Sequence, residues 1–186
     1  MAQTAKNVVF SKPKATGAVS SAPEGTELPV DGSTALAADY ESWGYINEDG
    51  VEEAHDLSSE SVNDYGKTTV LIIDGGDEVT YEFTPLEYTN PVVQKNLYGT
   101  DNVVSADGVL QSVTIGDDAK EVKVFVFEHV LSNGYIERDV VPRGKVTGID
   151  TTTYSAGEAI APKVTVTAMA DSNGKKVYKY FAKAGA

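Results

Sequence analysis

The sequence predicts a mainly β, single-domain antiparallel β-sandwich or barrel with one short flanking helix. Two Asn-Gly dipeptides, Asn133-Gly134 and Asn173-Gly174, each lie between runs rich in valine and aromatic residues. Asn-Gly accepts the positive φ angles of a two-residue type I′ turn, so each dipeptide predicts a β-hairpin. In residues 79–84, apolar and polar side chains alternate strictly, which is the pattern of a half-buried strand.

Length and composition divide the chain into an arm, a body and a tail. A chain of 186 residues suits one domain with a substantial core. Ser, Pro, Ala, Gly and Thr dominate residues 11–35, so we expect residues 1–35 to form a flexible N-terminal arm. Residues 36–182 form the predicted β-sandwich domain, which includes a long polar loop at 52–78, and residues 183–186 form a disordered tail.

One helix is predicted, at about residues 90–98. Asn90 is a suitable N-cap, Pro91 fits the first helical position, and Gly99 can end the helix with a left-handed backbone conformation. Two apolar residues one turn apart give this helix an inward face. The helix flanks the predicted sandwich.

The expected strand registers differ in quality. A two-residue loop at Asn173-Gly174 places Asp171 opposite Lys176, a favourable pair. The same loop length at the first hairpin places Glu128 opposite Asp139, which should repel. A strand slip through a bulge or a deliberately acidic sheet edge would each explain this pair, and the sequence leaves both open. A further hairpin is predicted at the Gly75-Gly76 turn.

Charge and composition exclude several classes of function. The net charge is −13 and the sequence pI is about 4.5, so the surface should repel nucleic-acid phosphates and anionic membranes. There are no cysteines, which excludes disulfides, thiolate zinc sites and cysteine nucleophiles. We expect neither a signal peptide in the first ten residues nor a membrane span, since no window has a sufficiently long apolar run.

No motif predicts catalysis, a cofactor or a metal site. Residues 66–68 resemble the end of a phosphate-binding loop but lack its first glycine. His55 and His129 are isolated in the sequence, which is typical of structural or surface histidines. The acidic clusters lack the ligand order of a calcium loop. A weak alternative remains, in which Glu128 and Asp139 form the carboxylate pair of a hydrolase.

Trp43 and Tyr45 are predicted to project to the same side of a short strand or turn. Two such rings can form a sugar-binding platform. Packing in a core or a subunit contact is the favoured interpretation, because large rings bury much area at low entropic cost.

Many weak motifs follow one another in order along the chain. The first motifs are Glu27-Leu-Pro-Val-Asp-Gly-Ser-Thr-Ala35, Trp43-Gly-Tyr-Ile-Asn-Glu-Asp-Gly-Val51, Val79-Thr-Tyr-Glu-Phe-Thr-Pro-Leu-Glu87 and Asn90-Pro-Val-Val-Gln-Lys-Asn-Leu-Tyr-Gly99. The later ones are Val140-Val-Pro-Arg-Gly-Lys-Val-Thr147, Tyr154-Ser-Ala-Gly-Glu-Ala-Ile160 and Val164-Thr-Val-Thr-Ala168. In this order, from about residue 24 to residue 181, the sequence resembles the major tail tube protein of long, non-contractile-tailed bacteriophages.

The resemblance implies a virion structural protein, made in the host bacterial cytoplasm, that forms hexameric rings stacked into a hollow tube. Implied partners are other copies of itself, a tape-measure protein inside the tube, and tail terminator and distal tail or baseplate proteins at its ends. Double-stranded DNA would pass through without specific binding. The N-terminal arm and the loop at 52–78 would become ordered on assembly.

Candidate site residues follow from this resemblance. Acidic residues facing the lumen would repel the DNA backbone, and the candidates are Glu128, Glu137 and Asp139. The candidates for inter-ring or subunit contacts are the exposed apolar positions of the arm, the aromatic segment and the loop: Val8, Val9, Phe10, Leu28, Trp43, Tyr45, Tyr65, Leu71, Ile72 and Ile73.

Two other functions remain open from the sequence. A tube component of a related injection machine, such as a contractile tail or a type VI secretion system, would have the same fold. A monomeric β-sandwich adhesin or carbohydrate-binding module would share only its β architecture.

Overall fold

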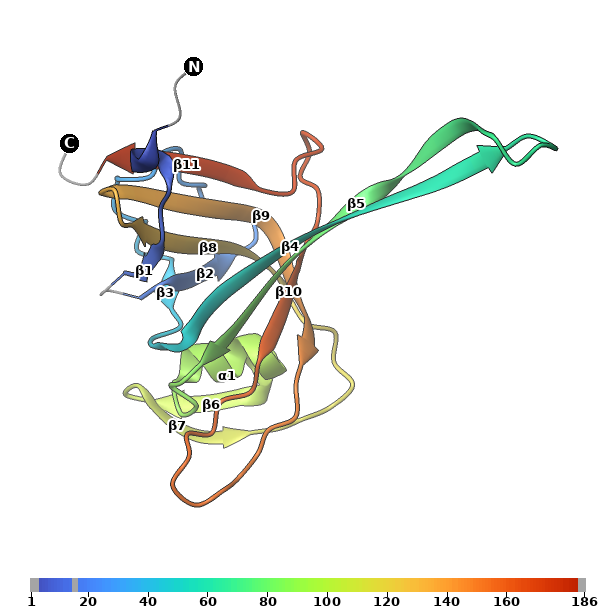
Figure 1. The fold of residues 1–186 in the computed structure, drawn as a ribbon. Helices are drawn as coiled ribbons and strands as arrows, with labels where there is room; N and C mark the ends of the chain where they lie inside the picture. Colours follow the sequence, from blue (N-terminus) through green and yellow to red (C-terminus); the bar gives the residue numbers. More distant parts are fainter. Residues whose placement is uncertain (1–3, 15–16, 184–186) are drawn as a thin grey trace.

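The computed structural model describes residues 4–14 and 17–183 and shows one body from which a long hairpin projects (Figure 1). Residues 1–3 of the predicted arm and 184–186 of the predicted tail lie outside the described residues. The strands are β1 (Ser11–Pro13), β2 (Val19–Pro23), β3 (Glu41–Ser42), β4 (Ile46–Asn63), β5 (Thr69–Pro85), β6 (Val103–Ala106), β7 (Val109–Val113), β8 (Val122–Leu131), β9 (Tyr135–Ile149), β10 (Val164–Ala168) and β11 (Tyr178–Lys183). The helices are η1 (Ala5–Asn7), α1 (Pro91–Tyr98) and η2 (Thr100–Asn102).

One antiparallel sheet forms the body, with the strand order β3-β2-β8-β9-β10-β5-β4. β1 also pairs with β8, and β11 also pairs with β9. The long strand β9 joins the two layers, because residues 135–140 pair with β11 whereas residues 144–149 pair with β10. The sheet therefore folds over on itself along β9 into an open sandwich or barrel, which confirms the predicted fold class (Figure 1).

The main core lies between the two layers. Its largest side chains are aromatic and come from the segment between β3 and β4, from β5 and from β8: Trp43, Tyr81, Phe83, Phe125 and Phe127. The rings of Trp43 and Phe83 meet edge to face with centroids 5.0 Å apart, a favourable geometry for aromatic pairs. The predicted alternation in residues 79–84 is confirmed, since the odd-numbered side chains of that stretch are buried in this core.

The predicted helix is confirmed as α1, which closes one end of the core beside the β6–β7 hairpin (Figure 1). Asn90 caps it, because its side-chain oxygen accepts the Val92 N–H at 2.9 Å. Leu97 is fully buried and turns the apolar side of the helix inward. Gly99 ends the helix with φ +100° and ψ 145°, a positive-φ conformation but not the expected left-handed helical one.

The first Asn-Gly hairpin is confirmed, but the turn type and strand register predicted for it are wrong. β8 and β9 are joined by three residues, 132–134, and only Gly134 has positive φ. A two-residue type I′ turn would need positive φ at Asn133 as well. The additional loop residue shifts the register by one, so that Glu128 faces Arg138 rather than Asp139. The expected repulsion is thereby replaced by an ion pair.

The second Asn-Gly segment forms a turn but not the predicted hairpin. Across this turn the Lys175 N–H donates to Asp171 Oδ1, and the Asp171 N–H donates to the Lys175 carbonyl oxygen. β10 and β11 then diverge, because each pairs with a different half of β9 instead of with the other. Asp171 therefore accepts from the Tyr178 hydroxyl at 2.6 Å rather than facing Lys176 across a ladder.

The expected long loop is an ordered two-stranded hairpin. β4 and β5 pair along almost their whole length and project from the body, with a turn at residues 64–68 (Figure 1). Gly75 and Gly76 do not form a hairpin turn as predicted. They lie within β5, where a register shift between Ser58 and Ser59 marks a bulge.

The N-terminal arm is shorter than expected. β2, within the predicted arm, pairs with β8, and Val19 and Ala22 are buried. Residues 24–40 then cross the outer face of the layer formed by β2, β8, β9 and β11, and we call them the strap. Leu28 of the strap, with Leu36 and Tyr40, packs on a second apolar cluster on that face.

Loss of the helix cap should weaken the fold measurably. We expect Asn90→Ala to lower the free energy of unfolding by about 1 kcal/mol, because the Val92 N–H loses its acceptor. Asn90→Ser should retain most of the stability, since serine is also an N-cap acceptor. Urea unfolding of the three proteins measures the difference, and an alanine variant as stable as the serine variant would contradict it.

Candidate assembly surfaces

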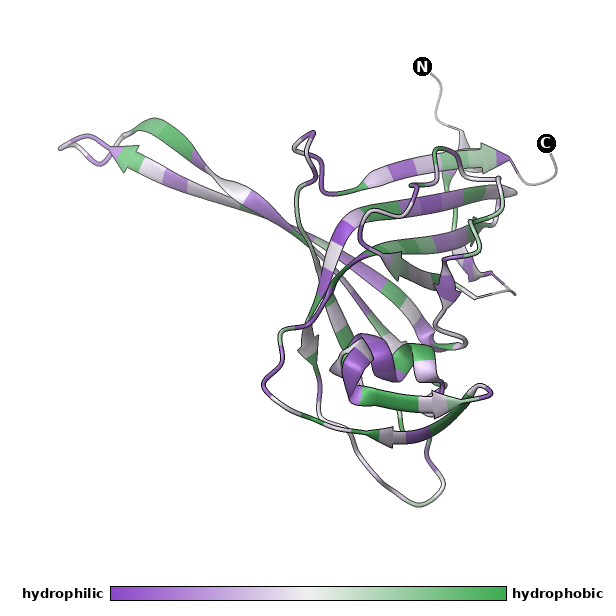
Figure 2. Ribbon diagram, turned by 180° about the vertical axis from the view of Figure 1, so that it is seen from behind, coloured by the Kyte–Doolittle hydropathy of each residue, from purple (hydrophilic) through white to green (hydrophobic). Residues whose placement is uncertain are grey.

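The outer part of the β4–β5 hairpin, residues 57–74, exposes apolar side chains and is called the distal hairpin. Its large apolar residues are 40–78% exposed, and Tyr65 at the turn is completely exposed: Leu57, Val62, Tyr65, Val70, Leu71, Ile72 and Ile73. Figure 2 shows apolar residues close to its end. Because consecutive strand residues alternate, these side chains lie on both sides of the hairpin.

Both faces of the distal hairpin are apolar. Val62 pairs with Leu71, so these two side chains share one face, and Ile73 lies two residues further on that face. Val70 and Ile72 point to the opposite face, because consecutive strand residues alternate. A hairpin that is apolar on one face can bury that face on a single surface. A hairpin that is apolar on both faces is fully buried only between two surfaces.

The base of the hairpin is fixed to the body by lysines. Glu52 and Glu82 face each other across β4 and β5, and the Lys163 ammonium lies 2.6 Å from a carboxylate oxygen of each. These bonds hold the pKa of Glu82 below and that of Lys163 above the ordinary value. On the core side, Lys179 bonds Glu53 at 2.6 Å. The body thus presents the distal hairpin on a fixed base.

The first described residues also expose apolar side chains. Val8 is 80% and Phe10 63% exposed, and Val9 is exposed to a smaller extent. The segment is held beside the β8–β9 turn, since the Phe10 N–H donates to Ser132 Oγ and the Ser132 N–H donates to the Phe10 carbonyl. Ordered backbone with exposed apolar side chains makes this segment a second candidate contact surface.

Three other predicted contact residues lie in different places. Trp43 is fully buried, and its Nε1 donates to Ser21 Oγ at 3.0 Å, so it belongs to the core and not to a subunit contact. Tyr45 is 72% exposed, so the two rings do not project to the same side as predicted, and they do not form the sugar-binding platform that was the alternative interpretation. Leu28 is partly buried against the second apolar cluster and fastens the strap.

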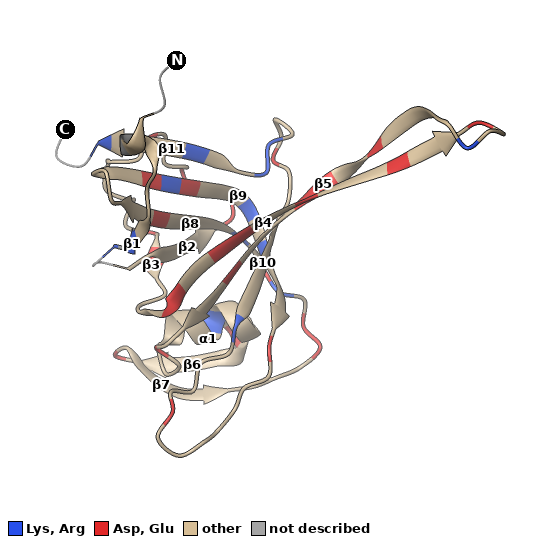
Figure 3. Cartoon of the chain, in the orientation of Figure 1, with Lys and Arg blue, Asp and Glu red and all other residues tan. Residues whose placement is uncertain are grey.

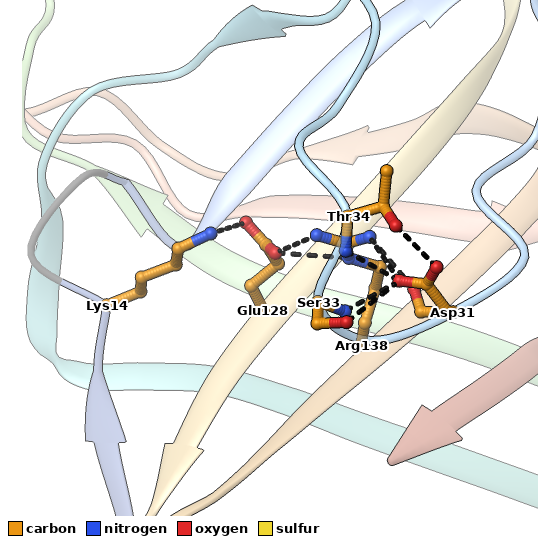
Figure 4. A network of polar contacts seen from close by, with 6 residues as sticks. All are labelled: Lys14, Asp31, Ser33, Thr34, Glu128 and Arg138. Atoms are coloured by element: carbon orange, nitrogen blue, oxygen red, sulfur yellow. Dashed lines mark hydrogen bonds and ion pairs between the residues drawn. The ribbon is translucent and has the colours of Figure 1, made fainter. Parts of the chain in front are cut away.

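A buried polar network fastens the strap to the outer sheet (Figure 4). Arg138 is 2% exposed; its Nη2 lies 2.7 Å from Glu128 Oε1, and its Nη1 donates to the Asp31 carbonyl oxygen at 2.8 Å. The Lys14 ammonium bonds the other oxygen of Glu128 at 2.6 Å. Every charge of this network thus has a partner, which a buried ion pair requires.

The strap has its own local order around Asp31. Its carboxylate accepts the backbone N–H groups of Ser33 and Thr34 and the Thr34 hydroxyl. These hydrogen bonds, above all those from Thr34, hold the pKa of Asp31 well below its ordinary value. Further along, burial raises the pKa of Tyr40 to about 12, and its hydroxyl donates to the Glu27 carbonyl. The strap is therefore a structured cover.

A second polar cluster lies on the opposite face of β9. Asp139 is 1% exposed, and its Oδ2 accepts from the Tyr81 hydroxyl at 3.0 Å and from Lys179 at 2.6 Å. Burial and the Asp139 charge raise the pKa of Tyr81, which keeps its hydroxyl protonated as a donor. Burial opposes the charge of Lys179, but its bonds to Asp139 and Glu53 outweigh burial and raise its pKa.

These two networks bear on the predicted lumen residues. Glu128 and Asp139 are buried and neutralised within the protomer, so in this arrangement they serve packing and register rather than a surface field. They lie on opposite faces of the sheet and form no hydrolase pair. Glu137 keeps a partly exposed carboxylate, 3.5 Å from Lys179. A lumen position for these residues stays a prediction.

The described residues form neither a metal site nor a membrane-spanning helix. Within residues 4–14 and 17–183, no group of three or more His, Asp or Glu side chains is arranged to hold a metal ion. No helix of that part of the chain is long and apolar enough to cross a membrane. His55 bonds Asp77 at 2.8 Å on the exposed hairpin, which is a surface pair.

Sequence reasoning missed Arg138 as the centre of the strap network. The sequence does carry a signal for it, because Arg138 lies between two acidic residues in an apolar strand, and such a residue is buried only if its charge is paired. It also missed the hairpin itself, since an acidic segment of 27 residues has the composition of a loop. The contact candidates Leu71, Ile72 and Ile73 lie on that hairpin and are exposed, and their role in contacts stays a prediction.

A β-body that exposes an apolar hairpin is typical of a subunit of a larger assembly. The chain matches the family model described as phage tail tube protein over residues 1–185, and it therefore belongs to the phage tail tube protein family. This is a structural family of the virion tail, whose members self-assemble into a tube with other tail proteins. No curated protein matches the chain.

The network at Arg138 should dominate the stability of the outer sheet. We expect Arg138→Met to lower the free energy of unfolding by about 3 kcal/mol, because it leaves the buried Glu128 with only the partly exposed Lys14 as a charged partner. The double variant Glu128→Leu, Arg138→Met should recover most of that loss, since no buried charge remains and the partly exposed Lys14 can turn to solvent. Urea unfolding of both variants tests this, and equal losses in the single and double variants would contradict it.

Proposed function

We propose that this protein forms hexameric rings that stack into the hollow tail tube of a long, non-contractile-tailed phage, through which DNA passes during ejection. The tube would enclose a tape-measure protein and end on tail terminator and distal tail or baseplate proteins. The family match supports the tube, and the resemblance in residues 24–181 favours the non-contractile class. The observation that carries the proposal is the distal hairpin, apolar on both faces and free in the protomer.

Energetics favour burial of this hairpin in an assembly. Fully burying a leucine- or isoleucine-sized side chain contributes about 1.5–3 kcal/mol. Leu71, Ile72 and Ile73 are each about half exposed, and together with Val62 and Val70 they form an apolar surface whose burial would stabilise a contact. The hairpin and the surface that receives it differ, so the contact is heterologous and continues from copy to copy into rings or tubes.

Acidity supports passage of DNA rather than its binding. A net charge of −13 per chain gives each ring a strong negative field, which repels the phosphate backbone. Of the three lumen candidates, Glu137 is the one whose carboxylate is partly exposed in the protomer. We therefore place Glu137 at the lumen first, and Glu128 and Asp139 only if assembly rearranges their ion pairs.

Polymerisation should depend on the distal hairpin. We expect the purified protein to form rings or tubes at high concentration, and Leu71→Asp to abolish them while leaving the fold intact, because residue 71 is 55% exposed. Ile115→Asp, at another exposed position, is the matched control and should still assemble. Negative-stain microscopy and sedimentation measure the outcome. Persistent monomers of the parent protein at millimolar concentration would overturn the proposed function.

The lumen assignment has its own test. We expect a cryo-EM map of the tube to place the Glu137 carboxylate toward the bore, since it is the exposed member of the acidic set. Parent tubes should retain no DNA in a binding assay at physiological salt. A map with this side chain on the outer wall would refute the assignment without affecting the tube itself.

A further inference from the structure

A cleft of about 790 Å³ opens between the base of β4 and the face of β9 and β11. Lys14 and Gly17 border it from the N-terminal segment, and the exposed ring of Tyr45 stands in its lining. Its size lies in the range of clefts that bind a ligand or a peptide side chain. The proposed assembly through the hairpin does not by itself assign an occupant to this cleft.

Two buried acceptors in the cleft lack a hydrogen-bond donor. Asp139 Oδ1 and Asn47 Oδ1 are both buried, both residues line the cleft, and neither atom has a partner among the residues that the structure describes. Buried acceptors are nearly always satisfied, because an unsatisfied one loses its water without compensation. Two of them in one cleft indicate that a group with several donors completes the site.

The charge of the cleft specifies the sign of that group. Its lining contains six carboxylates: Glu48, Asp49, Glu53, Glu87, Glu137 and Asp139. Two lysines face them, but Lys14 is already paired with Glu128, and Lys179 is shared among three acidic side chains. The cleft therefore has a negative electrostatic potential, and a cation with several N–H donors, such as an ammonium or guanidinium group, complements it.

The hairpin turn carries such a cation. Lys67 is the one Lys or Arg residue between positions 46 and 85, a segment otherwise rich in Asp and Glu, and it lies in the turn at residues 64–68. Figure 3 shows a basic position at the far end of the hairpin, with acidic positions along the rest of it. Its φ is +64°, a left-handed conformation that is unfavourable for a residue other than glycine. A lysine at that position, next to the completely exposed Tyr65, indicates a role beyond forming the turn.

The hairpin's own tip cannot fill its own cleft. The ten residues from Glu53, in the cleft, to Asn63 extend roughly 30 Å at the usual rise of a strand, and the tip points away from the body (Figure 1). A hairpin tip that occupies the cleft therefore comes from a second copy.

We propose that the hairpin tip of one copy inserts into this cleft of the next copy, with Lys67 donating to the Asp139 and Asn47 oxygens and Tyr65 packing on Tyr45. This contact rests on the proposed self-assembly and specifies which surfaces meet. The ammonium has three donors, enough for both unpartnered acceptors. Because tip and cleft are different surfaces, each copy offers one of each, and the contact propagates in one direction.

Substitutions at position 67 separate the charge from the turn. Lys67→Gly should relieve the positive φ and leave the fold at least as stable, yet raise the concentration needed for assembly on the order of tenfold or more. Lys67→Arg should assemble, because a guanidinium also has several donors. Lys175→Glu, in another exposed turn, is the control and should assemble normally. Normal assembly of Lys67→Gly would overturn the proposal.

A disulfide trap tests the contact directly, because the chain has no cysteine of its own. Tyr65→Cys and Tyr45→Cys are prepared as separate proteins, mixed at high concentration and oxidised. We expect a cross-linked dimer that requires both variants, and none when Ser172→Cys replaces Tyr45→Cys. Absence of that dimer in a mixture that forms tubes overturns the tip-to-cleft contact and leaves the proposed function standing. If the parent forms no tubes, the proposed function fails, while a specific dimer would still support the contact and its absence would refute it.

Discussion

The ion pair between Glu128 and Arg138 is the interaction on which the outer sheet depends. Its closest N–O distance is 2.7 Å, and both side chains are almost completely buried. The pair forms only in the register that a three-residue turn imposes on β8 and β9, so it selects that register against its neighbours. The same guanidinium binds the Asp31 carbonyl, which couples the register of two strands to the position of the strap.

The rest of the body supports a hairpin that could not stand alone. An isolated two-stranded ribbon is marginally stable in water, and this one is apolar near its tip and acidic along its length. Lys163 and Lys179 neutralise its base on opposite faces and join it to β10 and β11. The protomer therefore holds an unsatisfied surface in a defined direction, so that little ordering remains to be done when a second copy binds it.

Local patterns predicted several elements of this fold correctly. The capping sequence around Asn90 specifies a helix wherever it lies, and the alternation in residues 79–84 specifies a half-buried strand. Both signals depend on neighbours within a few positions, so no distant part of the chain overrides them. The apolar run at 70–73 also stood out in the sequence, but the polar residues around it gave no sign that it belongs to a long strand.

The sequence by itself determined the β class, the single helix, the acidic surface and the family resemblance. Only the tertiary structure decided strand pairing and burial. It assigned β10 and β11 to different halves of β9, Trp43 to the core, and Glu128 and Asp139 to opposite buried networks. The physical reason is that propensity and periodicity act over a few residues, whereas a partner strand or a buried counterion is chosen by the packing of segments that lie beyond this local range.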